Sequence, residues 1–203
     1  WWPFPHSDGL FWVKYKADGL KKVLGEIADE SMDIKTNLSS PAIFTSFDAT
    51  ANKPFYFKST DVEKSLDKSI YKILTVLEST TAAPGYLPAS KVTINGQDHA
   101  FLDGGLVNNN PALVGYVEAE KLAGSRKIEL LSFGTGVVDY SVSYKRVANA
   151  GFLSVAPVVL NAFFAAMESH PGQILEEKLK DDYIRFQLYN IDSDHAELDD
   201  VSS

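Results

Sequence analysis

The 203-residue sequence contains no cysteine. Disulfide bonds, thiolate metal sites and a cysteine nucleophile are therefore excluded, although this absence does not fix the compartment. Basic residues are outnumbered by acidic ones, 19 to 27, which gives a formal net charge of −8 at pH 7. That balance argues against a nucleic-acid partner, which would need a basic stripe, and against simple electrostatic docking on anionic lipid. A local basic patch near Lys64, Lys68 and Lys72 remains compatible with it.

Uninterrupted apolar runs are scarce. Residues 152–167 are apolar almost throughout, but Pro157 interrupts the run, and a membrane-spanning helix needs ~20 apolar residues. We therefore expect a buried helix there, with the wall of an acyl-chain pocket as the alternative, because such pockets are mostly apolar. No repeat, heptad or low-complexity tract divides the chain, so residues 1–203 are expected to belong to one domain.

The stretch from Phe101 to Pro111 reads Phe-Leu-Asp-Gly-Gly-Leu-Val-Asn-Asn-Asn-Pro. An apolar run ends at Leu102, and an amphipathic segment follows over residues 112–122. Glycine permits positive φ or close approach of another segment, asparagine caps helices, and proline suits a first helical position. This order of residues therefore predicts a strand, then a sharp loop, then the start of a helix. Asp103 then lies at a strand end, where open α/β sheets bind ligands. Its local sequence is also typical of a plain turn cap.

Hydrophobic periodicity and turn residues predict the other elements. Helices are expected over residues 18–30, with Asp18 as the N-cap, and over residues 61–79, 152–167 and 173–182. Strands are expected over residues 42–48, 54–58, 91–94, 97–102, 128–133 and 183–188. Asn95-Gly96 favours a type I′ hairpin turn, and the apolar run 128–133 suits a central parallel strand covered on both faces. Residues 1–15 are expected to pack on an absent part, and residues 192–203 to form a loose acidic tail.

The run from Asp103 to Ala112 resembles the second signature of the patatin-like phospholipases, in which the aspartate is the partner of a nucleophilic serine. Further stretches resemble that family in the same order: residues 42–48 with 54–57, 79–88, 130–136, and 183–187 with 198–200. The resemblance implies a three-layer α/β/α fold with a mostly parallel central sheet. It assigns Asp103 as the catalytic base, and Gly104, Gly105 and Asn109 as support for its loop.

Two parts of the family pattern are missing. The family's serine lies in a Gly-x-Ser-x-Gly turn and its oxyanion hole in an upstream glycine-rich loop, and the sequence contains neither. We therefore expect the C-terminal portion of a single patatin-like domain, with the serine outside this chain and this portion inactive alone. The missing N-terminal part is the expected partner, because a parallel sheet cut through its middle would expose strand edges.

The resemblance implies a lipid acyl hydrolase of the phospholipase A or lysophospholipase type, acting at a membrane surface through a serine-aspartate dyad. A base of this kind needs partial desolvation, because burial raises the pKa of a carboxyl group. Two alternatives stay open: a non-catalytic lipid- or protein-binding module on the same scaffold, and an esterase for small soluble esters. A cytoplasmic protein with peripheral membrane association is favoured, with secretion as the other possibility.

The histidines decide whether a triad is an alternative to the dyad. Strand alternation places His99, Phe101 and Asp103 on one face, but beside the Asn-Gly turn His99 is expected at the surface. The remaining histidines have no motif support, and they are His6, His170 in a loop before Pro171, and His195. No histidine pair has the spacing of zinc hydrolases, and the Asp181-Asp182 and Asp199-Asp200 pairs are expected to be solvated, so neither a metal nor a cofactor is expected.

Overall fold

The computed structural model describes residues 13–137 and 141–189. The expectations for residues 192–203, for most of residues 1–15, and for His6, His195 and the Asp199-Asp200 pair lie outside the described residues. The chain divides into two compact units, residues 1–108 and residues 109–203, and each is described by itself.

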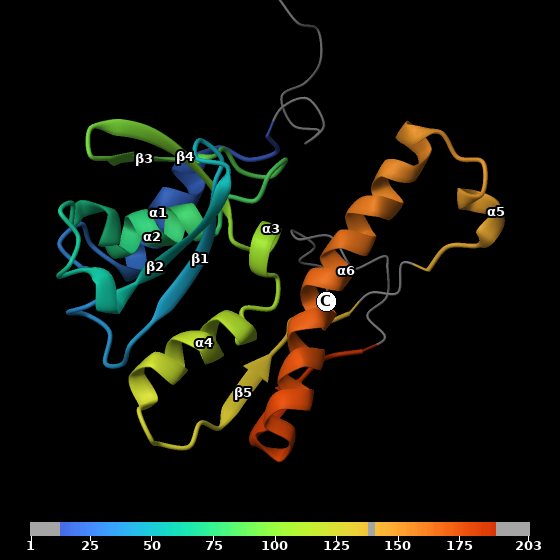
Figure 1. Ribbon diagram of the computed structural model, residues 1–203. Helices are drawn as coiled ribbons and strands as arrows, with labels where there is room; N and C mark the ends of the chain where they lie inside the picture. Colours follow the sequence, from blue (N-terminus) through green and yellow to red (C-terminus); the bar gives the residue numbers. More distant parts are fainter. Residues whose placement is uncertain (1–12, 138–140, 190–203) are drawn as a thin grey trace, which may run out of the picture. The chain divides into compact units, whose positions relative to one another are not determined.

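The first unit is built on a four-stranded antiparallel sheet in the order β2-β1-β4-β3 (Figure 1). Its strands are β1 (Ile43–Asp48), β2 (Lys53–Lys58), β3 (Ser90–Ile94) and β4 (Gln97–Asp103). Helix α2 (Ile73–Thr80) packs on β1, β3 and β4, and α1 (Ala17–Ile27) packs on α2. The core lies between them, around fully buried Phe57, Phe101, Ile34 and Val76.

The predicted hairpin is confirmed. Ile94 pairs with Gln97 across the turn, and Asn95 and Gly96 have φ values of 51° and 80°. Positive φ at both central residues is what a type I′ turn requires, and it suits the right-handed twist of the two strands. The turn therefore fixes the register of β4, and with it the place of Asp103 at the end of that strand.

The single helix expected over residues 61–79 is wrong. The structure has the 3-10 helices η1 (Ser59–Asp61) and η2 (Ser69–Tyr71) before α2. The Asp67 carboxylate accepts hydrogen bonds from the Ser69 backbone N–H at 3.0 Å and from its hydroxyl at 2.5 Å. Such local bonds compete with helix formation, and Leu66 projects into solvent with 96% of its surface exposed. The expected cap at Asp18 is also wrong, because Lys16 holds the N-cap position.

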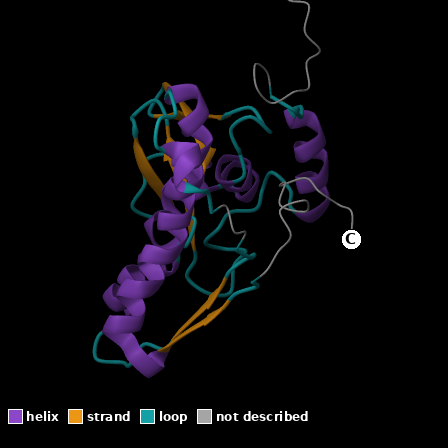
Figure 2. Ribbon diagram, turned by 90° about the vertical axis from the view of Figure 1, so that its right-hand side faces the viewer, coloured by secondary structure: helices purple, strands orange, loops and turns teal. Residues whose placement is uncertain are grey.

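The second unit contains α4 (Ala112–Ala123), β5 (Leu130–Phe133), α5 (Tyr144–Val147), α6 (Phe152–Leu179), η3 (Lys180–Asp182) and β6 (Tyr183–Phe186). Strands β5 and β6 pair in parallel and lie side by side in Figure 2. Helix α4 packs against α6 and β5. A small core of Ala112, Tyr116, Leu175 and Tyr183 holds these elements together.

The mixed α/β class is confirmed, but the mostly parallel central sheet is wrong for the described residues. The larger sheet is antiparallel, and only β5 and β6 run parallel. Short connections explain the β1–β2 and β3–β4 pairings, because a tight turn can join antiparallel strands but not parallel ones. Strand β5 is one of only two strands in its sheet, so the prediction of cover on both faces is also wrong: Leu131 and Phe133 are 59% and 73% exposed.

Helix α6 differs most from expectation. It runs unbroken over 28 residues through Pro157 and Pro171, so residues 173–182 form no separate helix and His170 lies in a helix rather than a loop. The expected burial of residues 152–167 is wrong, because Phe152 and Leu153 are 81% and 87% exposed. By length and composition alone, the helical segment Phe152–Asp182 is long and apolar enough to cross a membrane.

Candidate functional site

Asp103 is the last residue of β4 and lies beside β1, opposite Ser46. Its backbone N–H donates to the Ala82 carbonyl oxygen at 3.0 Å, so the strand end is tied to the small-residue segment that follows α2. The side chain is partly buried. The hairpin on one side and these bonds on the other give the carboxylate a fixed position at the edge of the core.

The surroundings of the Asp103 carboxylate make it a better base than an exposed one. Its Oδ1 accepts a hydrogen bond from the Gly105 N–H at 2.7 Å. Burial raises the pKa of Asp103, and this hydrogen bond opposes the rise. Within residues 13–137 and 141–189, no cation pairs with it, in contrast to Asp98 on the same strand, which lies 2.6 Å from Lys91 Nζ.

Gly104 is required by close approach and not by an unusual backbone angle. A Cβ atom there would lie 2.2 Å from the backbone oxygen of Thr45 on β1. The Gly104 N–H donates to the Thr80 carbonyl oxygen at 3.3 Å, and its own carbonyl accepts from the Val107 and Asn108 N–H groups at 3.1 and 2.9 Å. The loop after Asp103 is thus wound into a single helical turn, α3 (Gly105–Asn108), on the edge of the sheet.

The three consecutive asparagines that begin at the last residue of α3 have different surroundings. Asn108 Nδ2 lies 3.2 Å from the Tyr56 hydroxyl oxygen, whereas Asn109 is exposed, so its supporting role stays a prediction. Asn110, which the sequence analysis did not single out, is 1% exposed. Its Nδ2 donates to the Glu168 carbonyl oxygen at 2.9 Å, and its Oδ1 accepts from the Ala112 N–H at 3.2 Å. Pro111 holds the N-cap position of α4 and not the expected first helical position. The bond from the Ala112 N–H to Asn110 is therefore an Asx turn, which the Asn-Pro pair could have signalled.

The serine opposite Asp103 does not serve as its nucleophile. Ser46 is fully buried, and its hydroxyl oxygen lies 2.6 Å from the Leu102 carbonyl oxygen and 2.9 Å from that of Ser79. The single hydroxyl hydrogen is used by these backbone acceptors. Ser46 therefore ties β1 to β4 and α2, which is a structural role.

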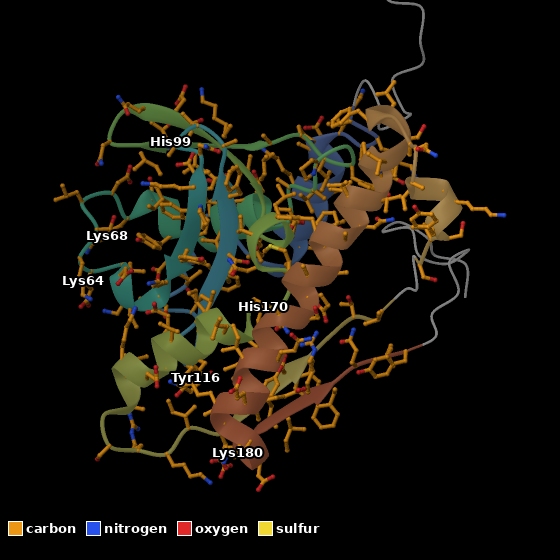
Figure 3. The ribbon with its side chains drawn as sticks, turned by 45° about the vertical axis from the view of Figure 1, so that its right-hand side comes forward. Lys64, Lys68, His99, Tyr116, His170 and Lys180 are labelled. Carbon is orange, nitrogen blue, oxygen red and sulfur yellow. The ribbon has the colours of Figure 1, made fainter. Side chains whose placement is uncertain are left out.

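His99 lies beside a different carboxylate. Its Nδ1 is 2.7 Å from Oδ2 of Asp48, which is 1% exposed, while Asp48 Oδ1 accepts from the Thr50 and Ala51 N–H groups at 3.0 Å each. The expected surface position is wrong, because the His99 side chain is only 17% exposed. Figure 3 shows it near the β3–β4 hairpin. The ring nitrogen Nδ1 of His99 is therefore held by Asp48 and not by Asp103.

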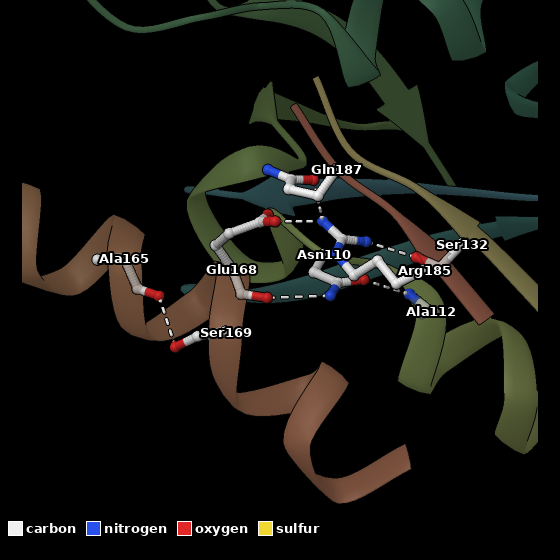
Figure 4. A network of polar contacts seen from close by, with 8 residues as sticks. All are labelled: Asn110, Ala112, Ser132, Ala165, Glu168, Ser169, Arg185 and Gln187. Carbon is white, nitrogen blue, oxygen red and sulfur yellow. Dashed lines mark hydrogen bonds and ion pairs between the residues drawn. The ribbon is translucent and has the colours of Figure 1, made fainter. Parts of the chain in front are cut away.

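A second polar cluster lies within the other unit (Figure 4). Arg185 on β6 pairs with Glu168 on α6, donates to the Ser132 hydroxyl on β5, and donates to Gln187 Oε1 at 3.1 Å. The Arg185 and Glu168 side chains are 14% and 19% exposed. Because one guanidinium joins α6 to both strands, we assign this cluster a structural role. In the part of the chain that the structure describes, no group of His, Asp or Glu side chains is arranged to hold a metal ion.

Comparison with known proteins gives a consistent result. A family model described as patatin-like phospholipase matches residues 1–116, which include the four-stranded sheet and the loop after Asp103 and end within α4. Patatin group D-2 of Solanum tuberosum is 30% identical over 98% of this chain and 58% of its own length.

Two other relatives extend the range. Patatin-like protein 4 of Arabidopsis thaliana is 28% identical over 98% of this chain and 56% of its own length. A cGAMP-activated phospholipase of Pseudomonas aeruginosa is 28% identical over 86% of this chain and 52% of its own length. The chain thus spans little more than half the length of the curated relatives it matches.

Proposed function

The chain belongs to the patatin-like phospholipase family, and we propose from that membership that it is part of a lipid acyl hydrolase whose catalytic base is Asp103. The nucleophilic serine comes from a segment outside these 203 residues, since the sequence holds no Gly-x-Ser-x-Gly turn. The substrate class is a carboxylic ester of a membrane lipid, phospholipid or lysophospholipid. No metal or cofactor takes part.

One observation carries the assignment of Asp103. Its carboxylate is partly buried, has a raised pKa, and accepts one backbone hydrogen bond on Oδ1. Among the described residues it has no cationic partner, so no ion pair competes with a hydroxyl group for its carboxylate oxygens. An aspartate that served only as a turn cap would gain nothing from partial burial, because desolvation disfavours its charged form.

The reaction follows in two halves. Asp103 takes the proton of the serine hydroxyl while the serine oxygen attacks the ester carbonyl. The protonated Asp103 then gives that proton to the departing alcohol oxygen, which belongs to a lysophospholipid when the substrate is a phospholipid and to a glycerophosphodiester when it is a lysophospholipid. A water molecule next gives its proton to Asp103 and attacks the acyl-serine ester. Return of the proton to serine releases the fatty acid and restores the ionised carboxylate. Each transfer requires a heavy-atom separation of roughly 2.6–3.2 Å.

Gly104 and Gly105 contribute to the proposed site because neither has a side chain. Gly104 is buried against β1, so a side chain there would displace the end of β4. Gly105 supplies the N–H that orients Oδ1. The two positions that follow Asp103 thus carry no side chain that could block the approach of a serine to the carboxylate.

The decisive experiment compares Asp103→Asn with Asp98→Asn in the full-length protein that includes the serine. Both substitutions remove one negative charge from β4, but Asp98 is exposed and paired with Lys91. We expect Asp103→Asn to lower kcat/KM on phospholipid and on a soluble acyl ester by about 10²–10⁴-fold, the usual cost of losing a general base. Asp98→Asn should leave both rates within about twofold, since exposed substitutions have small effects.

Unchanged turnover in the Asp103 variant would contradict the assignment and would favour a binding module or another base. Hydrolysis of soluble esters alone, dependent on Asp103 but absent on phospholipid vesicles, would keep the dyad and replace the lipid substrate by small esters.

A further inference from the structure

The C-terminal end of α2 is bonded to both strands that meet at Asp103. The last carbonyl groups of an α-helix have no donor within the helix and take donors from elsewhere, and α2 ends at Thr80. The carbonyl oxygen of Ser79 lies 2.9 Å from the Ser46 hydroxyl oxygen on β1. The carbonyl oxygen of Thr80 accepts from the Gly104 N–H at 3.3 Å. The end of this helix therefore supports the loop that begins after Asp103.

Thr80 is bonded to β1 as well as to Gly104. Its hydroxyl donates to the carbonyl oxygen of Thr45 at 2.6 Å, which is the oxygen that a Cβ at residue 104 would approach to 2.2 Å. The register of β1 on β4 ends at the pair Ser46 and Asp103, and Thr45 and Gly104 are the next residues along. Thr80 thus bonds to both residues that flank the end of this register, one on each side, next to the proposed base.

The Thr80 hydroxyl affects this loop more than it affects the fold. Helix α2 also packs on β1, β3 and β4, Val76 in its centre is fully buried, and the contact between Ser46 and Ser79 does not involve Thr80. Without the hydroxyl, the carbonyl oxygen of Thr45 loses a donor, and the end of α2 is no longer tied to β1 at that point. The carbonyl group that holds the residue after Asp103 is then free to shift.

We propose that Thr80 is a positioning residue, which sets the placement of the Asp103 carboxylate toward the incoming serine. It acts through Gly104, which it holds, and through Gly105, whose N–H donates to Asp103 Oδ1 at 2.7 Å. A base has to lie within roughly 2.6–3.2 Å of the hydroxyl group that it deprotonates, so a small shift of the loop is enough to slow proton transfer. This role rests on the proposed function and adds a residue to it.

Thr80→Val tests the proposal, because valine resembles threonine in shape and lacks the hydroxyl. Thr81→Val is the matched control, since the neighbouring Thr81 hydroxyl donates to the Leu77 carbonyl oxygen at 2.7 Å and not to β1. In the full-length protein that includes the serine, Thr80→Val should lower kcat on a soluble acyl ester at least about tenfold, toward the 10²-fold cost of a misplacement of about 1 Å. KM should change by less than about twofold, because the lost contact does not bind substrate. Thr81→Val should leave both constants within about twofold.

Two further measurements separate positioning from a general loss of stability. Thr80→Ser keeps the hydroxyl and should restore kcat to within about threefold of the unsubstituted protein, because the bond to Thr45 can form again. Amide hydrogen exchange reports the loop without any need for turnover: the N–H groups of Gly104 and Gly105 should exchange faster in Thr80→Val than in Thr81→Val. Circular dichroism verifies that each variant is folded at the assay temperature, so that every kcat refers to folded protein.

Two results would overturn the positioning role and leave the proposed base in place. The first is an unchanged kcat in Thr80→Val while Asp103→Asn is strongly impaired. The second is an equal loss of kcat in Thr80→Val and Thr80→Ser, which would show that the hydroxyl is not the cause. Normal turnover in Asp103→Asn would refute the proposed function and the role of Thr80 together, since Thr80 would then have no base to position.

Discussion

The position of Asp103 depends on the absence of a side chain at residue 104, and Gly104→Ala tests that dependence. The added Cβ would lie 2.2 Å from the Thr45 backbone oxygen and 2.5 Å from its carbonyl carbon. Those approaches are roughly 1 Å closer than a normal van der Waals contact. Thr45 has little freedom to move, because it pairs with Tyr56 on β2 and its carbonyl oxygen accepts the Thr80 hydroxyl hydrogen at 2.6 Å.

The clash must therefore be relieved by a shift of β4 or α3. Forcing an extra carbon into a packed site costs about 1–3 kcal/mol, and we expect the upper part of that range because the obstacle is backbone. Gly115→Ala is the matched control. Gly115 lies within α4 with open space around its Cβ position, so alanine there should stabilise the helix by about 0.5–1 kcal/mol.

Urea unfolding followed by circular dichroism and tryptophan fluorescence measures both changes, and the full-length protein adds acyl-ester turnover. Gly104→Ala should lower the free energy of unfolding and should also lower kcat, because the shift moves the Asp103 carboxylate. If Gly104→Ala changes the free energy of unfolding by less than about 0.5 kcal/mol, the range of an ordinary surface substitution, the close approach to Thr45 is not the reason for glycine.

Three further predictions concern stability. Burial raises the pKa of Asp103, so ionisation of this group costs folding stability as pH rises through that pKa. Asp103→Asn should therefore have a higher free energy of unfolding than the unsubstituted protein at neutral pH, but not in acid. The pKa of Asp33 is shifted the other way, because hydrogen bonds led by the one from the Thr36 N–H lower it. Asp33→Asn should therefore lower the free energy of unfolding at neutral pH, and its difference from the unsubstituted protein should vanish as acid protonates Asp33. Arg185→Gln should lower the free energy of unfolding, measured by thermal unfolding, by about 3 kcal/mol, the lower end for breaking a buried ion pair, because it leaves the carboxylate of Glu168 unpaired. Lys64 and Asp61 form an exposed pair, and a matching loss in Lys64→Gln would contradict the role of burial.

Much of the first unit could be predicted because its signals are local. The Asn95-Gly96 turn, the strands on either side of it and the strand end at Asp103 each depend on a few adjacent residues. Two of the three antiparallel pairings in the larger sheet, β1 with β2 and β3 with β4, were also within reach, because four-residue and two-residue connections do not join parallel strands. The family resemblance drew the prediction toward a parallel sheet instead.

Contacts between distant residues could not be predicted in this way. His99 pairs with Asp48, 51 residues away in sequence, and Asn110 with Glu168, 58 residues away. Neither contact produces a local residue pattern that could be recognised in a single sequence. The exposure of α6 was missed for a related reason: an apolar helix is compatible with a protein core or with lipid, and only its neighbours decide between them.

The most direct measurement of the central claim is the rate at which a fluorophosphonate acyl-ester mimic labels the serine of the full-length protein, since labelling reports activation of the nucleophile without later steps. We expect rapid labelling of the unsubstituted protein and of Asp98→Asn, and a rate about 10²–10⁴-fold lower for Asp103→Asn. Equal labelling rates in all three proteins would show that Asp103 does not activate the serine.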